Sequence, residues 1–249
     1  MSGPLPDFPG AVGITALRVY PWEAADGLCG GSPHMHLCCT EGYVVISGAG
    51  RAQTLTTEGF AETPLRPGDV VWFTPGTIHR AVNDSCGKHA DLYVVALMQN
   101  SGLPESGDAV ITLPPQYLTD PGTYRRAISL DGPDGPSPER ARARRDLAVE
   151  GFTELRRRTE AGDGAALEAF HAAAAALVQP QLPRWRQRWE QGAAAVSART
   201  GQQIDALAAG DHHHLREATV ARIPQPEPSG LGMCGHLSPY DPVRSPPSG

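Results

Sequence analysis

Three histidines and one glutamate in the first third of the chain have the types and spacing of a metal site. His34 and His36 are two residues apart, and on an extended strand residues two apart point to the same face. Glu41 has the opposite parity, so it can join them only through a bend or a bulge. His79, from a later segment, is expected to supply a fourth ligand. Three imidazoles and one carboxylate with vacant coordination positions suit Fe, Mn, Ni, Co or Zn.

The elements that must position these residues change in character near residue 130. Before it, short β-branched runs alternate with Gly and Pro, which predicts an all-β barrel or sandwich. The runs lie at 12–20, 42–47, 51–55, 70–73, 80–82 and 92–98. The Pro- and Gly-rich stretch 131–138 predicts a linker or an exposed loop.

Helices are predicted beyond this loop, from about residue 138 to residue 210. Ser137 is a candidate N-cap and Pro138 suits the first helical position. Further helices are expected at 165–178, 183–191 and 193–209. The last segment is rich in Pro and Gly and is expected to be irregular, with the option of folding back on the barrel. We therefore divide the chain into 1–130, 131–222 and 223–249.

Composition excludes several classes of protein. The 249 residues carry a net charge of −6, which argues against a nucleic-acid binder. No run of 18 apolar residues occurs, so we expect no membrane span, and the first residues lack the basic and apolar regions of a secretory signal. The five cysteines include no CxxC pair. We therefore expect five reduced thiols and a cytoplasmic location.

The two histidine segments resemble the two motifs of the cupin superfamily. In the first, G(X)5HXH(X)3,4E(X)6G, the matching residues are His34, His36, Glu41 and Gly48. In the second, G(X)5PXG(X)2H(X)3N, they are Gly68, Gly76, His79 and Asn83. Leu28 stands where the first motif opens with glycine, and Thr74 stands at the proline of the second.

The resemblance covers residues 12–113 and implies a mainly β fold with an α-helical C-terminal extension. The β part is expected to be a small antiparallel, jelly-roll-like barrel that holds one divalent ion on His34, His36, Glu41 and His79. It also implies a homodimer with a small-molecule substrate. No nucleic-acid or membrane partner is expected.

Three functions agree with such a site. We expect a metal-dependent enzyme, and favour an oxygenase that uses Fe(II), with Mn, Ni, Co and Zn as other candidate ions. One alternative is a redox-neutral lyase or sugar isomerase, in which the ion acts as a Lewis acid. The other is a non-catalytic protein that binds a small molecule. Glu41 and Tyr43, which share one strand face, are the candidate catalytic residues for proton transfer.

Other reactive or aromatic residues have simpler interpretations. Cys38 has the parity of the two neighbouring histidines, but we expect a buried free thiol. Arg80 is expected to form a surface ion pair, and Trp72 to lie in the core. Cys234 and His236, in a glycine-rich part of the tail, could cover the mouth of the barrel, with a plain turn as the default.

Overall fold

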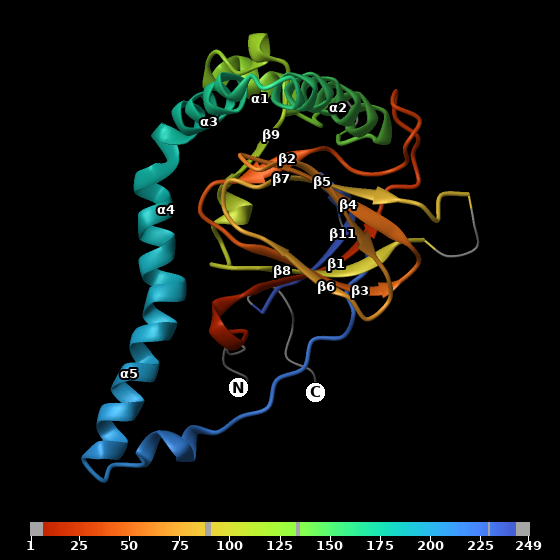
Figure 1. The fold of residues 1–249 in the computed structure, drawn as a ribbon. Coiled ribbons are helices and arrows are strands. Elements are labelled where there is room, and N and C mark those ends of the chain that lie inside the picture. Colours follow the sequence, from red (N-terminus) through yellow and green to blue (C-terminus); the bar gives the residue numbers. More distant parts are fainter. Residues whose placement is uncertain (1–6, 88–90, 133–134, 229, 243–249) are drawn as a thin grey trace.

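Two antiparallel sheets face each other in the computed structural model, which describes residues 7–87, 91–132, 135–228 and 230–242 (Figure 1). The six-stranded sheet has the order β10-β11-β1-β8-β3-β6, and the five-stranded sheet has the order β5-β4-β7-β2-β9. The first comprises β1 (Gly13–Val19), β3 (Glu41–Ser47), β6 (Val70–Phe73), β8 (Tyr93–Met98), β10 (Gly230–Leu231) and β11 (Gly235–Tyr240). The second comprises β2 (His34–His36), β4 (Gly50–Thr56), β5 (Gly59–Leu65), β7 (Ile78–Asn83) and β9 (Ala109–Ile111).

The predicted β class is confirmed, with one difference in shape. Within the described residues the strands form two hydrogen-bonded ladders and not one closed ring. Alternation of buried and partly exposed side chains in β3 and β8 reflects one face turned to the opposite sheet. The space between the sheets is filled by an apolar cluster that includes Leu17, Tyr43, Val45 and Leu65.

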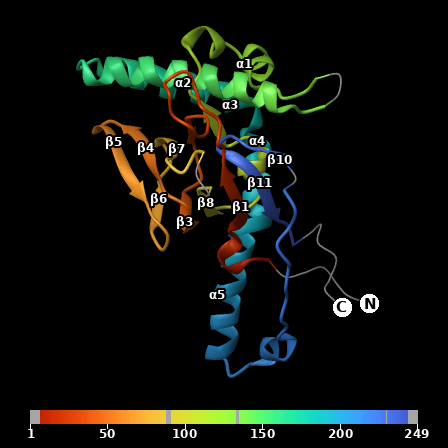
Figure 2. The ribbon, with the colours of Figure 1, turned by 90° about the vertical axis from the view of Figure 1, so that its right-hand side faces the viewer.

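The first three helices of the extension cover the outer face of the five-stranded sheet, and the last two run down beside the β domain (Figures 1 and 2). Its helices are α1 (Pro121–Ile128), α2 (Pro138–Glu160), α3 (Gly164–Val178), α4 (Leu182–Trp189) and α5 (Ala195–Ala208). A π-helical turn at Glu190–Ala194 joins the last two. The predicted helical region is confirmed, and Ser137 caps α2 by accepting a hydrogen bond from the backbone N–H of Arg140. Helix α1 was not predicted.

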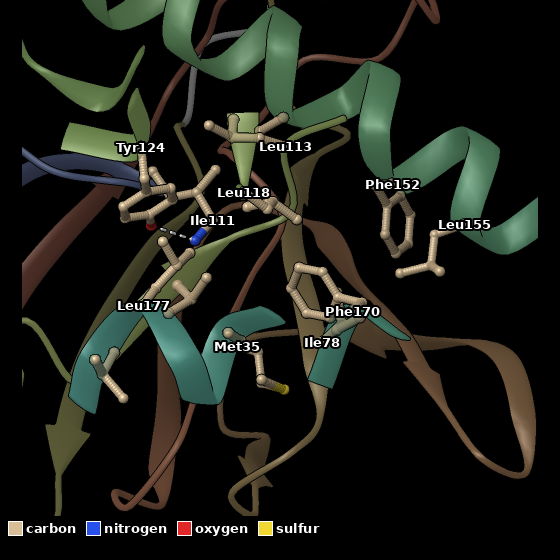
Figure 3. Packing of buried hydrophobic residues seen from close by; sticks show 14 of the residues in the cluster. Met35, Ile78, Ile111, Leu113, Leu118, Tyr124, Phe152, Leu155, Phe170 and Leu177 are labelled. Carbon is tan, nitrogen blue, oxygen red and sulfur yellow. Dashed lines mark hydrogen bonds between the residues drawn. The ribbon is translucent and has the colours of Figure 1, made fainter. Parts of the chain in front are cut away.

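Helices and sheet share one apolar core (Figure 3). Met35 of β2 and Ile78 of β7 point away from the facing sheet and pack in the same cluster as Phe152 of α2 and Phe170 of α3. Helix α2 lies very close to the backbone at Thr112. A Cβ added at Gly151 would be only 2.2 Å from the carbonyl oxygen of Thr112. Only glycine permits this contact. None of the helices within the described residues is long and apolar enough to cross a membrane.

The end of the chain returns to the β domain. Strand β11 pairs antiparallel with β1, with Leu17 opposite Leu237 and Thr15 opposite Pro239. The backbone N–H of Ser32 donates to the carbonyl oxygen of Met233 at 2.8 Å, which fixes the preceding turn. The expectation of an irregular tail is therefore wrong for residues 230–231 and 235–240, because the free edge of β1 supplies hydrogen-bonding partners.

Three predicted side-chain environments are wrong. Trp72 is 65% exposed, because its neighbour Phe73 takes the inward-facing position on β6. Cys38 is exposed, since residues 37–40 form a turn outside the sheets. Arg80 forms an ion pair with Asp26, but its side chain is fully buried because the loop that carries Asp26 covers it.

The prediction of five reduced cysteines is also wrong. Cys29 and Cys86 form a disulfide, while Cys38, Cys39 and Cys234 are free. The bridge is possible because Asn83 donates its backbone N–H to the carbonyl oxygen of Cys29 at 2.9 Å, which brings the two segments together. The cytoplasmic location stays a prediction, but the expected set of five free thiols no longer supports it.

We predict that Phe152→Ala lowers the free energy of unfolding by about 3–5 kcal/mol, because it removes a buried ring from the contact between helix and sheet. Leu207→Ala, at a position that is 51% exposed on α5, is the matched control and should change it by less than about 0.5 kcal/mol. Urea unfolding followed by circular dichroism measures both. Equal effects of the two substitutions would show that α2 does not depend on the sheet.

Candidate metal centre

Four side chains from both sheets meet between them. His34 and His36 project from β2, and His79 lies directly opposite His34 in the β2–β7 ladder. Glu41 is the first residue of β3, in the other sheet. All four are buried, and one ligand atom from each lies within 4.8 Å of the others. The turn at residues 37–40 crosses from one sheet to the other. Glu41 can therefore face the two histidines although its position along the chain has the opposite parity.

The carboxylate of Glu41 is the centre of the cluster. Its Oε2 lies 2.8 Å from Nε2 of His79, 3.2 Å from Nε2 of His36 and 3.8 Å from Nε2 of His34. The three imidazoles therefore turn the same ring nitrogen towards one oxygen.

The other nitrogen of each imidazole, Nδ1, is held by a hydrogen-bond acceptor. The acceptors are the carbonyl oxygens of Ser32 and Thr77 and Oδ2 of Asp108, at 2.9–3.1 Å. An acceptor at Nδ1 requires a proton there, so in the neutral ring Nε2 carries the lone pair. Three lone pairs then face the carboxylate of Glu41, an arrangement that only a cation or an added proton can satisfy. The donor set fits a divalent ion with a preference for nitrogen and oxygen ligands.

Burial and mutual contact shift the acidity of the cluster. Burial, together with the two neighbouring imidazoles, holds the pKa of His34 well below its usual range. Burial also disfavours charge on His36, but its hydrogen bonds to Asp108 and Glu41 outweigh this and raise the pKa to about 9. Burial alone would raise the pKa of Glu41, yet hydrogen bonds from His36 and His79 hold it well below its usual range. Without an ion, a proton on His36 thus offsets part of the negative charge of Glu41 and Asp108. A bound cation would take over that role.

Asp108 is the residue that sequence reasoning missed. It immediately precedes β9, is fully buried, and its two oxygens accept the backbone N–H groups of Cys38 and Cys39 as well as Nδ1 of His36. Burial opposes its charge, but these hydrogen bonds hold its pKa below the usual value. One carboxylate thus fixes both a candidate ligand and the turn that leads to Glu41. No local pattern marks it, because its partners lie about 70 residues earlier.

A cavity of about 260 Å³ opens beside the cluster and is bordered by His34, His36 and Glu41. Its other walls come from β1, β8, the turn at Pro104 and the C-terminal strand. They are formed by Thr15, Leu17, Ala96, Met98, Pro104, Glu105, Met233, Cys234, Leu237 and Pro239. His34, His36 and Glu41 therefore form part of the wall of a largely apolar chamber, which His79 does not border.

The other candidate residues occupy different places. Tyr43 is fully buried, its hydroxyl lies 3.6 Å from Sγ of Cys234, and burial raises its pKa well above the usual value. A catalytic role for Tyr43 stays a prediction. Cys234 borders the cavity, as one of the two interpretations of the tail proposed. His236 instead makes edge contacts with the rings of Tyr20 and Trp22.

We predict that Asp108→Asn weakens binding of a divalent ion about 10- to 100-fold, because the amide has one acceptor oxygen for three donors and lacks the negative charge that supports the ring of His36. Competition with a chelating dye gives the affinity. Asp120→Asn, a substitution that keeps a side-chain acceptor at the exposed N-cap of α1, should leave the affinity unchanged. An unchanged affinity in Asp108→Asn would contradict this role.

Comparisons with known proteins give short matches to solved structures and none to a curated protein. Capsular polysaccharide assembling protein CapF from Staphylococcus aureus matches with 17% identity and a TM-score of 0.32, over 39% of this chain and 25% of that one. An uncharacterized conserved protein with a double-stranded β-helix domain from Klebsiella pneumoniae gives 21% identity and a TM-score of 0.27, over 34% and 65%. A sugar phosphate isomerase from Silicibacter pomeroyi gives 23% identity and a TM-score of 0.26, over 35% and 50%. The chain thus spans between a quarter and just under two thirds of these proteins.

The family model described as Cupin matches residues 9–119. This segment contains both histidine segments, all four clustered side chains and the strands from β1 to β9. The helices from α1 onwards and the C-terminal strand lie outside the match. The matched sequence and the two facing antiparallel sheets place residues 9–119 of this chain in the cupin superfamily.

Proposed function

We propose that this protein is a metal-dependent enzyme that acts on a small molecule, with one divalent ion held by His34, His36, Glu41 and His79. One observation carries the proposal. Every imidazole of the cluster has its Nδ1 tied to an acceptor and its Nε2 aimed at the carboxylate of Glu41. Three imidazole nitrogens that converge on a buried carboxylate need a positive charge between them, and a divalent ion would supply it for all three rings at once.

An oxygenase that uses Fe(II) is the reaction class that we favour. A divalent ion at this position would polarise an oxygen donor of the substrate, and iron would add redox chemistry with dioxygen. The chain's own contribution is to orient the ligands and to place the substrate against largely apolar walls. Such walls would reduce the contact of the reacting groups with water.

A redox-neutral lyase or isomerase would need a group that accepts a proton from the substrate. Tyr43 was the candidate for this role, but burial raises its pKa and keeps the phenol neutral at pH 7. Glu41 is the remaining carboxylate of the cluster, and all three imidazoles contact it or lie near it. These contacts commit Glu41 to the ion, which leaves Glu105, whose carboxylate also borders the cavity, as the proton acceptor for this alternative.

We predict that the protein, produced without an affinity tag and reconstituted with Fe(II), Mn(II) or Zn(II), retains one ion per chain after desalting. The His79→Ala variant should lose the ion and keep its fold. Elemental analysis and circular dichroism measure the two effects. Adventitious binding is controlled by replacing His212, His213 and His214 with alanine, since this exposed run lies outside the cluster. That triple variant should retain the ion. Loss of the ion in the triple variant, with retention in His79→Ala, would refute the proposed site.

We also predict that turnover requires dioxygen and is supported by Fe(II) but not by Zn(II), which has no redox chemistry. A panel of small uncharged oxygen-bearing compounds, assayed with an oxygen electrode and by mass spectrometry of products, provides the test. Equal turnover in anaerobic buffer, or higher turnover with Zn(II), would assign the protein to the lyase or isomerase class. Saturable binding without turnover under any condition would favour a binding protein.

A further inference from the structure

Apart from the proposed metal ligands, the wall of the cavity carries no cationic side chain among the residues that the structure describes. Away from those ligands, the one charged group among the described residues that border the cavity is the carboxylate of Glu105. A second anionic group on a ligand, away from the ion, would therefore lose its hydration without gaining a partner. The walls therefore disfavour a phosphate or a carboxylate at that position.

The three arginines on the described strands are engaged elsewhere, and Arg66, in the turn before β6, does not border the cavity either. Arg18 lies on the outer face of β1, with its guanidinium 4.9 Å from the centre of the Tyr93 ring. Arg51 pairs with Glu62, and Arg80 pairs with Asp26 on the far side of the five-stranded sheet. None of them borders the cavity.

The C-terminal strand supplies part of the cavity wall. Leu237 and Pro239 lie beside Leu17 and Thr15 in the β1–β11 ladder, and all four border the cavity. Leu237 packs closely on Gly232, where an added Cβ would lie 2.6 Å from its Cγ. Backbone pairing thus sets the position of this wall within the β domain, which favours selection by shape.

The backbone of Cys234, another residue of the wall, is held by close contacts. A Cβ added at Gly31 would lie 2.4 Å from the Cα of Cys234, and the backbone N–H of Tyr20 donates to the carbonyl oxygen of Cys234 at 3.2 Å. Burial raises the pKa of Cys234 to about 12, so the thiol is neutral at physiological pH and adds no charge to the wall. With a volume of about 260 Å³, the chamber lies near the lower end of the ~300–1,000 Å³ range of small-molecule sites.

We propose that the substrate is a small molecule that reaches the ion through oxygen donors and is uncharged and apolar elsewhere, and that the strand Gly235–Tyr240, with Met233, selects it. This inference rests on the proposed metal site and narrows it to a class of ligand. The selecting strand lies outside the segment that matches the cupin family model, so the family match does not determine the specificity.

The test compares 4-methylcatechol with 3,4-dihydroxybenzoate on the Zn(II)-loaded full chain. Both offer the ion the same pair of oxygens, and they differ only in a methyl or a carboxylate group at the far end of the ring. Zn(II) is chosen because it does not oxidise catechols. Isothermal titration calorimetry should give at least tenfold tighter binding of 4-methylcatechol.

Thr15→Lys adds a cation to the same wall and should reduce or reverse this preference, while Thr15→Met adds length without charge and should keep it. Equal or tighter binding of the carboxylate by the unmodified protein would overturn the proposal. The same holds if neither catechol binds the Zn(II)-loaded chain. An unchanged preference in a folded Thr15→Lys variant would also overturn it. Failure of the unmodified chain to retain Zn(II) would instead refute the proposed metal site, and this inference with it.

Discussion

Three imidazole nitrogens and a carboxylate must share a space from which water is excluded, and this constraint shapes the rest of the β domain. Each ring is kept in position by the acceptor on its outer nitrogen, so backbone carbonyls at Ser32 and Thr77 and the carboxylate of Asp108 are part of the same unit. The facing sheets are needed because the histidines come from one and the glutamate from the other. The helices in turn cover the outer side of the sheet that carries the histidines.

Local spacing, together with the resemblance to the two cupin motifs, was sufficient to predict the four clustered side chains and most of the strands and helices. His34 and His36 are two apart on a strand, and the 37–40 turn is the bend that Glu41 requires. Capping by Ser137 was also readable, because the N-cap is a property of a few consecutive residues. In these cases the deciding interaction lies within a few residues of sequence, whereas His79, which is 38 residues from Glu41, was identified by the second motif.

The features that escaped prediction depend on partners far apart in the chain. Arg80 is buried because Asp26 covers it, and Cys29 bonds with Cys86 across 57 residues. The strand Gly235–Tyr240 forms because β1 offers an open edge, although its own composition gives little strand signal. Trp72 was misplaced because alternation in a short strand identifies two faces without showing which one is buried.

The long separation between the ligands and the C-terminal wall has a consequence for biosynthesis. The four clustered side chains leave the ribosome well before Met233 and the strand that follows it. About 150 residues lie between them, which at roughly 5–20 residues per second corresponds to about 8–30 s of translation. During this interval the nascent chain lacks the residues that complete the cavity wall. The order of synthesis would therefore allow a metal ion to reach the ligands before the chamber beside them is complete.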